Sequence, residues 1–174
     1  MKKALLITVV FFLTVFLFLA YSNYPAEKKN ILIHIISDIK KDDGPPCVAI
    51  DLALTNLKLG NQVEVLFDAD AAWNLKKSDD GKNDYDRYEV PADLKKIVNA
   101  QLNVKGLLAL KNFGEFLEML HKKGAKIAVN GTWNVLTSVE KEVKGKTKMP
   151  SYVEPLTLKE MTESINSSEA YYSY

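Results

Sequence analysis

Cys47 is the only thiol in this sequence, and therefore the only candidate for a thiol nucleophile. It follows Pro45 and Pro46, which favour the start of a helix, and the free N–H groups of a helix N-terminus can stabilise a thiolate. The alternative is a small buried side chain that packs the first turn of that helix. Both hypotheses stay open, and Cys47 is our candidate catalytic residue. A single cysteine excludes an intramolecular disulfide and a multi-cysteine metal site.

Asn130, Gly131 and Thr132 form a short polar stretch after a predicted strand. Their amide, unhindered backbone and hydroxyl could hold a small anion or another polar ligand. The same residues also fit a strand-to-helix turn, with glycine for backbone freedom and Thr132 as the helix N-cap. We treat the three residues as candidate ligand-binding positions.

Asp68 and Asp70 follow another predicted strand and complete the candidate ligand-binding set. Two carboxylates at a strand end suit a hard cation such as calcium or magnesium, although Asx-turns explain the same residues. His34 and His121 stand alone in the sequence, without the spacing of a metal site. We therefore expect no metal and no other cofactor.

The N-terminus carries an export signal. Lys2 and Lys3 precede an apolar run from Ala4 to Ala20 that contains no charged residue. Small residues at Ala20 and Ser22 permit cleavage before Asn23, as in a signal peptide. A run of this length is also at the lower limit for spanning a bilayer, so an uncleaved membrane anchor is the second possibility. We expect an exported, periplasmic or otherwise extracytoplasmic protein, with 1–22 as signal or anchor, 23–29 as linker and 30–174 as one domain.

Alternating strand and helix patterns run through the remainder of the chain. Short apolar runs predict strands and 3.6-residue periodicity predicts helices, and their alternation is typical of βαβ units. The predicted strands cover 31–36, 62–67, 126–129, 152–155 and 169–174. The predicted helices cover about 46–59, 91–103, 112–123, 133–143 and 157–166, the last opened by a Thr157–Glu160 capping box. The polar stretch 76–89 predicts a solvated loop.

These elements predict a three-layer α/β/α sandwich, flavodoxin-like, on a mainly parallel sheet of four to five strands. In such sheets ligands bind beyond the carboxyl ends of the strands. Three loops qualify there, at 37–47, 68–74 and 130–134. The 23 basic and 22 acidic residues nearly cancel, which gives no electrostatic reason to expect nucleic acid as a partner.

Two stretches resemble the DsrE/DsrF-like (DsrEFH-like) sulfur-relay family. The first comprises the strand Ile31–Ile36, the helix ending at Gly60, and the run from Val63 to Asp68. The second is the run Leu120–Val129 followed by Asn-Gly-Thr-Trp at 130–133, which is similar to a family segment ending in a Cys-Gly-Thr-Cys-like loop. The resemblance covers about residues 30–174. It implies a flavodoxin-like domain that commonly assembles into oligomers.

In active members of that family, a cysteine after the third strand accepts sulfur as a persulfide. The matching positions here are Asn130 and Trp133, whose side chains cannot carry sulfur. We therefore expect a binding or oligomeric assembly module, a homo-oligomer that contacts membrane only through its N-terminal segment. A small anion or a sulfur-containing molecule is the expected ligand. Two alternatives stay open: a thiol or sulfur-transfer enzyme that uses Cys47, and a carrier of a small ligand or metal ion.

Overall fold

The computed structural model describes residues 27–174, which form a five-stranded, entirely parallel sheet. The strand order is β4-β3-β2-β1-β5. The strands are β1 (Asn30–Ile35), β2 (Gln62–Phe67), β3 (Lys126–Asn130), β4 (Val153–Leu156) and β5 (Ala170–Ser173). The flavodoxin-like prediction of a mainly parallel sheet of four to five strands is confirmed.

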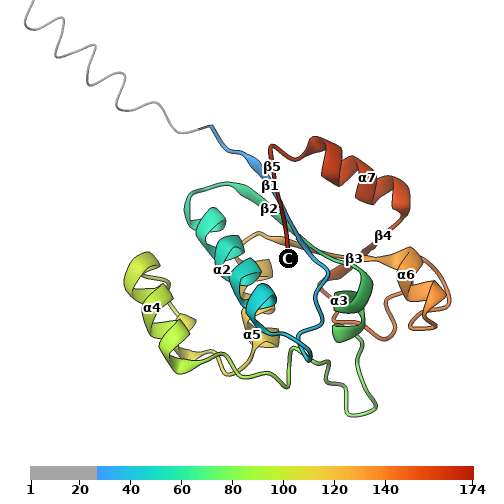
Figure 1. The fold of residues 1–174 in the computed structure, drawn as a ribbon, viewed down its shortest axis with the longest axis horizontal. Helices are drawn as coiled ribbons and strands as arrows, with labels where there is room; N and C mark the ends of the chain where they lie inside the picture. The colour runs from blue at the N-terminus through green and yellow to red at the C-terminus, as the bar shows by residue number, and fades with distance from the viewer. Residues whose placement is uncertain (1–26) are drawn as a thin grey trace, which may run out of the picture.

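Six α-helices and one 3-10 turn connect the strands. They are α2 (Gly44–Lys58), α3 (Ala69–Asn74), α4 (Ala92–Leu102), η1 (Leu107–Ala109), α5 (Phe113–Lys122), α6 (Gly131–Leu136) and α7 (Leu158–Ser167). Figure 1 shows α2 and α5 on one side of the sheet and α7 on the other, which makes three layers. Because α7 returns the chain from one edge strand, β4, to the other, β5, a right-handed crossover places it on the opposite face.

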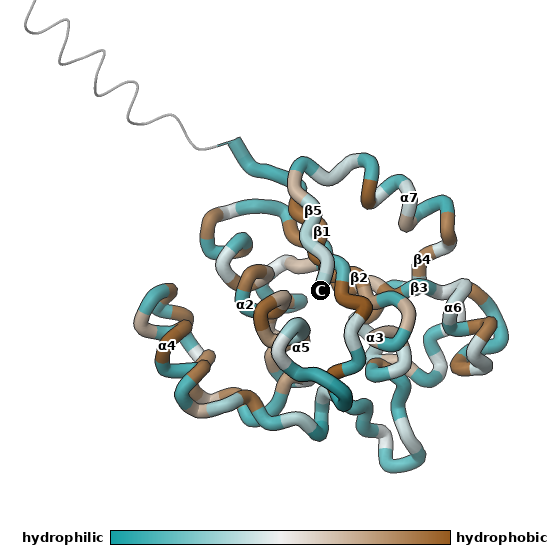
Figure 2. Tube along the Cα trace, in the orientation of Figure 1, coloured by the Kyte–Doolittle hydropathy of each residue, from teal (hydrophilic) through white to brown (hydrophobic). Residues whose placement is uncertain are grey.

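Successive side chains of each strand point to opposite faces of the sheet, which gives the domain two hydrophobic cores. Ile31, Ile33 and Ile35 of β1 belong to the larger core beneath α2 and α5. Leu32 faces the other way and joins the smaller core, which Met161 of α7 covers. Both faces of the central strands are thus apolar, as expected for a parallel sheet covered on both sides. Figure 2 shows hydrophobic residues along the central strands.

Helix ends follow the predicted local chemistry. Gly60 adopts φ +85° directly after α2, a left-handed conformation that glycine tolerates without a Cβ penalty. Thr157 and Glu160 form the predicted capping box at the start of α7, in which each side chain bonds the other residue's backbone N–H. Both helix boundaries are therefore encoded locally.

Three sequence predictions need correction. The segment after Asp68 is the short helix α3, not a loop, because Asp68 caps it. The helix predicted at 133–143 begins earlier, at Gly131, and ends at Leu136, before Ser138 turns into the left-handed region at φ +58°. The polar loop at 76–89 is anchored, not merely solvated, since Tyr85 within it is fully buried.

No helix within residues 27–174 is long and apolar enough to cross a membrane. The predicted signal peptide or anchor at 1–22, and most of the predicted linker, lie outside the described residues.

Candidate functional site

Three side chains lie at the carboxyl ends of three neighbouring strands, on the face that α7 covers, and a tyrosine of the next strand contacts one of them. His34 is near the end of β1, Asp68 follows β2, and Asn130 ends β3. Tyr171 comes from the edge strand β5, where it pairs in register with Leu32. We call His34, Asp68, Asn130 and Tyr171 the strand-end cluster.

The strand-end cluster is a continuous chain of polar contacts. The Tyr171 hydroxyl lies 2.7 Å from His34 Nδ1, and His34 Nε2 lies 3.4 Å from Asp68 Oδ2. The second distance is too long for a good hydrogen bond and is an electrostatic contact. The Asn130 amide donates to Asp68 Oδ1 at 2.8 Å. When the tyrosine hydroxyl donates to Nδ1, the imidazole N–H is on Nε2 and faces the carboxylate.

Asp68 is the centre of the cluster and stays ionised. The contact with His34 lowers the pKa of Asp68 most, burial opposes this effect, and hydrogen bonds from Asn130 and the Ala69 N–H lower it further. A carboxylate with a depressed pKa is a poor general base near neutral pH. Its two oxygens already face His34, Asn130 and the Ala69 N–H, so the arrangement favours a structural role for this aspartate.

The structure separates Asp68 from Asp70. Asp70 points to Lys41, with Nζ 2.8 Å from Oδ2, whereas Asp68 belongs to the strand-end cluster. The two carboxylates therefore do not converge as the hypothesis of a paired cation site requires. Within residues 27–174, no group of three or more potential metal ligands lies together.

Asn130, not Thr132, caps α6. The Asn130 side-chain oxygen accepts a hydrogen bond from the Trp133 N–H at 3.0 Å while its amide bonds Asp68. The N-cap prediction for Thr132 is thus wrong by two residues. Both ends of the Asn130 carboxamide are engaged within the fold.

Gly131 is required for space. A Cβ on this residue would lie 2.0 Å from the Val143 carbonyl oxygen and 3.0 Å from that of Leu156. Its φ is not in the left-handed region, so backbone freedom is not the reason for glycine here. The loop after α6 therefore occupies the space beside Gly131 that a ligand would need.

Cys47 packs against the larger core from the first part of α2 and is half-buried. Its own N–H already donates to the Asp43 carbonyl. The preceding Pro45 and Pro46 have no N–H, and the Gly44 N–H is bonded to the Asp42 side chain. The start of α2 therefore offers no free N–H group to a thiolate. Burial raises the pKa of Cys47 to about 11, with Asp43 and Asp51 adding to the effect.

We predict slow alkylation of Cys47. At neutral pH nearly all of the thiol is protonated, so iodoacetamide should react about tenfold or more slowly than with a free cysteine peptide. The rate should rise with pH until about pH 11. Intact mass measured over time gives the rate. A rate at pH 7 equal to that of the free peptide would contradict this environment.

Asp51, one turn after Cys47, has a buried Oδ1 without a hydrogen-bond partner among the described residues. Burial raises the pKa of Asp51 to about 6. The folded state therefore holds the Asp51 proton more tightly than the unfolded state does. This preference stabilises the fold fully below the unfolded pKa of about 4, and the contribution is lost as the pH rises through 6. We predict that Asp51→Asn raises the free energy of unfolding at pH 7 by about 1 kcal/mol, a value discounted for partial exposure. Urea unfolding at pH 7 and pH 4 should show the difference only at pH 7.

Ala69 is strained directly beside the strand-end cluster. It has φ 46°, a left-handed conformation that costs a residue with a Cβ about 1 kcal/mol. We predict that Ala69→Gly stabilises the fold by about 0.5–1 kcal/mol in urea unfolding. Ala71→Gly, the same change two residues later inside α3, should destabilise and serves as the control. Destabilisation by both variants would contradict the strain.

His34 and Tyr171 are the members of the cluster that sequence reasoning missed. In sequence terms His34 stands alone and Tyr171 is one residue of the predicted strand 169–174, because 137 residues separate the two. The usable signal was the alternation along β1, which puts His34 on the same face as Leu32 at the carboxyl end. The partner could not be identified without knowing that β5 lies beside β1.

No family model matches the sequence, and no curated protein matches it. Among solved structures, the chain is similar to the crystal structure of the YchN protein from E. coli. The TM-score is 0.54 at 14% sequence identity, and the match covers 85% of this chain and all of YchN. At this identity the likeness concerns the fold alone. The described domain therefore shares its three-layer α/β/α fold with YchN.

Proposed function

We propose that this chain is an exported domain of DsrE-like fold that acts as a binding or oligomeric assembly module and does not relay sulfur. One observation carries the proposal. The side chain at the relay position is the Asn130 carboxamide, which caps α6 and bonds Asp68. A carboxamide in these contacts has no nucleophile to offer to a persulfide donor.

The environment of Cys47 supports the same conclusion and argues against the alternative of sulfur transfer on this residue. Sulfur transfer needs a thiolate, and Cys47 has a pKa raised to about 11 at a helix start without free N–H groups. The thiol also packs against the larger core. These features describe a packing residue.

The test is incubation of the purified protein with a persulfide donor, followed by intact mass measurement. We expect no stable addition of sulfur to the wild-type chain. Asn130→Cys in a Cys47→Ser background restores a thiol at the relay position and is the positive control for the donor. Uptake by the wild type that Cys47→Ser abolishes would refute the proposal and establish the enzyme alternative.

Assembly is supported by apolar side chains on the α7 side of the molecule. Leu158 and Ile165 of α7 and Tyr171 of β5 are exposed there, and burying exposed apolar side chains favours association. We propose a homo-oligomer that uses this side. Sedimentation velocity at micromolar concentration should show a species larger than the monomer. A monomer would remove this part of the proposal and leave ligand binding, which native mass spectrometry tests by the mass retained.

Export is supported by the uncharged run from Ala4 to Ala20. Fractionation of a Gram-negative host that expresses the full chain should place it outside the cytosol. Its intact mass distinguishes cleavage before Asn23 from a retained anchor. A cytosolic chain of full mass would contradict export.

A further inference from the structure

The edge of the sheet at which the strands begin is where the N-terminal segment joins the domain. The described chain starts at residue 27, and β1 begins at Asn30 (Figure 1). Nine residues separate the apolar run ending at Ala20 from Asn30. Nine extended residues span at most about 30 Å. If the apolar run is held in a bilayer, this amino-terminal edge therefore lies within about 30 Å of the lipid headgroups.

This edge carries lysines without acidic partners. Lys28 precedes β1, Lys58 ends α2 and Lys123 follows α5. None of the three forms a salt bridge with any residue in the range 27–174, and residues 1–26 contain no aspartate or glutamate. Glu27 and Glu169 lie at the same edge, and the Glu169 carboxylate accepts a hydrogen bond from the Asn30 N–H. Neither forms a salt bridge with the three lysines, whose positive charges are available to an anionic surface.

The opposite edge has a different character. The loop between β1 and α2 contains Asp38, Asp42 and Asp43 beside Lys40 and Lys41, and Asp68 and Asp70 follow β2. Lys41 is paired with Asp70, and the carboxylates outnumber the lysines here by five to two. An anionic surface would repel this excess of carboxylates and attract the lysines at the other end of the sheet. The charge distribution thus favours one orientation of the domain on such a surface.

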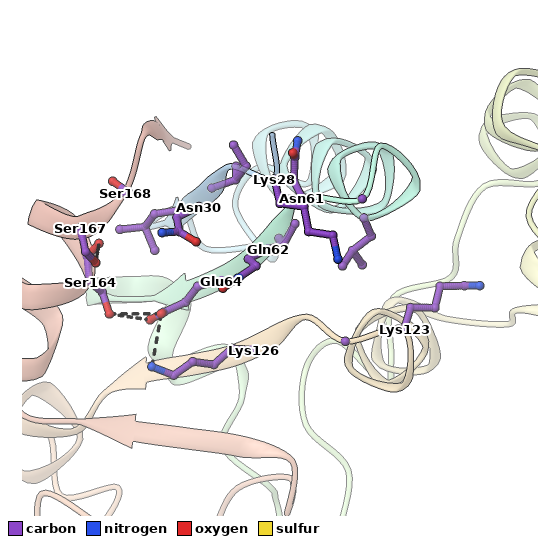
Figure 3. Close-up of a pocket in the computed structure, with 16 residues that line it drawn as sticks. Lys28, Asn30, Asn61, Gln62, Glu64, Lys123, Lys126, Ser164, Ser167 and Ser168 are labelled. Carbon is purple, nitrogen blue, oxygen red and sulfur yellow. Dashed lines mark hydrogen bonds and ion pairs between the residues drawn. The ribbon is translucent and has the colours of Figure 1, made fainter. Parts of the chain in front are cut away.

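A polar cavity of about 670 Å³ opens at the amino-terminal edge, between the starts of β1 to β3 and the end of α7. Figure 3 shows Ser164 and Lys126 on either side of Glu64. Lys126 Nζ lies 3.2 Å from the Glu64 carboxylate, and the Ser164 hydroxyl lies 3.1 Å from the same group. The negative charge of Glu64 is therefore compensated within the protein. Ser167 and Ser168 add hydroxyls to the same wall, while Lys123 extends outward from the end of α5.

We propose that the amino-terminal edge of the sheet docks on anionic phospholipid headgroups, with Lys28 and Lys123 at the lipid phosphates and the serine-lined cavity over a headgroup. This proposal rests on the proposed export of the chain. It has a consequence for the strand-end cluster, which lies at the other end of the sheet and faces away from the membrane. Any partner of that cluster then approaches from the aqueous side.

The test places the full chain in lipid nanodiscs and measures the proximity of each edge to the headgroups. In a Cys47→Ser background, Gln62→Cys reports on the amino-terminal edge and Asp79→Cys on the opposite side. Each is labelled with a fluorophore and quenched by a lipid that carries a spin label on its headgroup. We expect strong quenching at position 62 and weak quenching at position 79 in discs that contain phosphatidylglycerol.

Charge dependence separates docking from mere tethering. Each lysine near an anionic membrane contributes roughly one tenfold step or less in binding, so the double variant Lys28→Ser/Lys123→Ser should lower quenching at position 62 by about threefold or more. Discs of pure phosphatidylcholine should lower it equally. Lys105→Ser, which removes a lysine from the turn after α4, should leave it unchanged.

Equal quenching at positions 62 and 79 would overturn the proposal. So would quenching at position 62 that stays the same in pure phosphatidylcholine and in the double variant. Intact mass of the chain in the disc shows whether residues 1–22 are present, so loss of the apolar segment is recognised separately. The persulfide experiment is independent of the lipid. Failure of docking and failure of the proposed function are therefore distinguishable.

Discussion

Asp68→Ala should lower the free energy of unfolding by about 2–3 kcal/mol at pH 7, because it removes the acceptor of several partly buried donors at once. The Ala69 N–H at 2.7 Å and the Asn130 amide at 2.8 Å would lose their bonds, and α3 would lose its N-cap. His34 Nε2 would also lose the carboxylate that it faces. Urea unfolding should show a lower midpoint with an unchanged m-value.

The pH dependence of this loss has a defined sign. The folded state holds the pKa of Asp68 below its ordinary value, so the carboxylate stabilises the fold above the unfolded pKa of about 4. That contribution disappears as the pH falls through the folded pKa, and the difference between wild type and variant should shrink below about pH 4. A difference that is constant from pH 7 to pH 3 would contradict the ionised role.

Asp70→Ala is the matched control for this prediction. Asp70 is two residues away and is bonded to Lys41, but both side chains are largely exposed. Exposed ion pairs contribute about 0–1 kcal/mol, so the control should lose much less stability than Asp68→Ala. Equal losses would mean that the strand-end cluster does not carry the effect.

Gly131→Ala should cost about 2–3 kcal/mol by overpacking. The new methyl group would lie 2.0 Å from the Val143 carbonyl oxygen, and a backbone atom cannot rotate away as a side chain can. Either the loop after α6 moves or β3 and α6 shift. Urea unfolding measures the cost, and faster tryptic cleavage at Lys144 or Lys146 would locate the displacement in that loop.

Gly114→Ala provides the comparison, since Gly114 lies in the first turn of α5 as Gly131 does in α6. Its Cβ would lie 2.0 Å from the Asp86 side-chain oxygen. A carboxylate can change rotamer, so this variant should lose clearly less stability than Gly131→Ala. If both variants cost the same, the backbone contact at Val143 is not the reason for glycine.

Local signals in the chain account for most of the elements. The Thr157–Glu160 box and Gly60 act within one helical turn, so their outcome does not depend on the remainder of the fold. Alternation in the strands reports burial directly, because neighbouring side chains point to opposite faces. The predicted end of α6 was wrong since Ser138 adopts a left-handed backbone that its residue type does not announce.

The candidate site is different in kind, because its contacts join residues far apart in the chain. Asp68 and Asn130 were predicted as ligand-binding positions, and the structure does bring them together, as partners of each other. Asp70, Gly131 and Cys47 lie elsewhere or are enclosed by their own neighbours. Sequence identifies polar residues at strand ends, but only packing decides which of them have spare bonding capacity.

The sequence by itself determined that Cys47 is the only thiol, that an asparagine and not a cysteine follows the third strand, and that the elements are those of a parallel α/β sheet. These are properties of residue type and of local periodicity, which need no neighbours in space. Tertiary structure alone decided that β5 lies beside β1, that Tyr171 meets His34, and that Cys47 packs half-buried against the larger core. Strand order and burial depend on contacts across the whole domain, and they set both the partners and the pKa of Cys47.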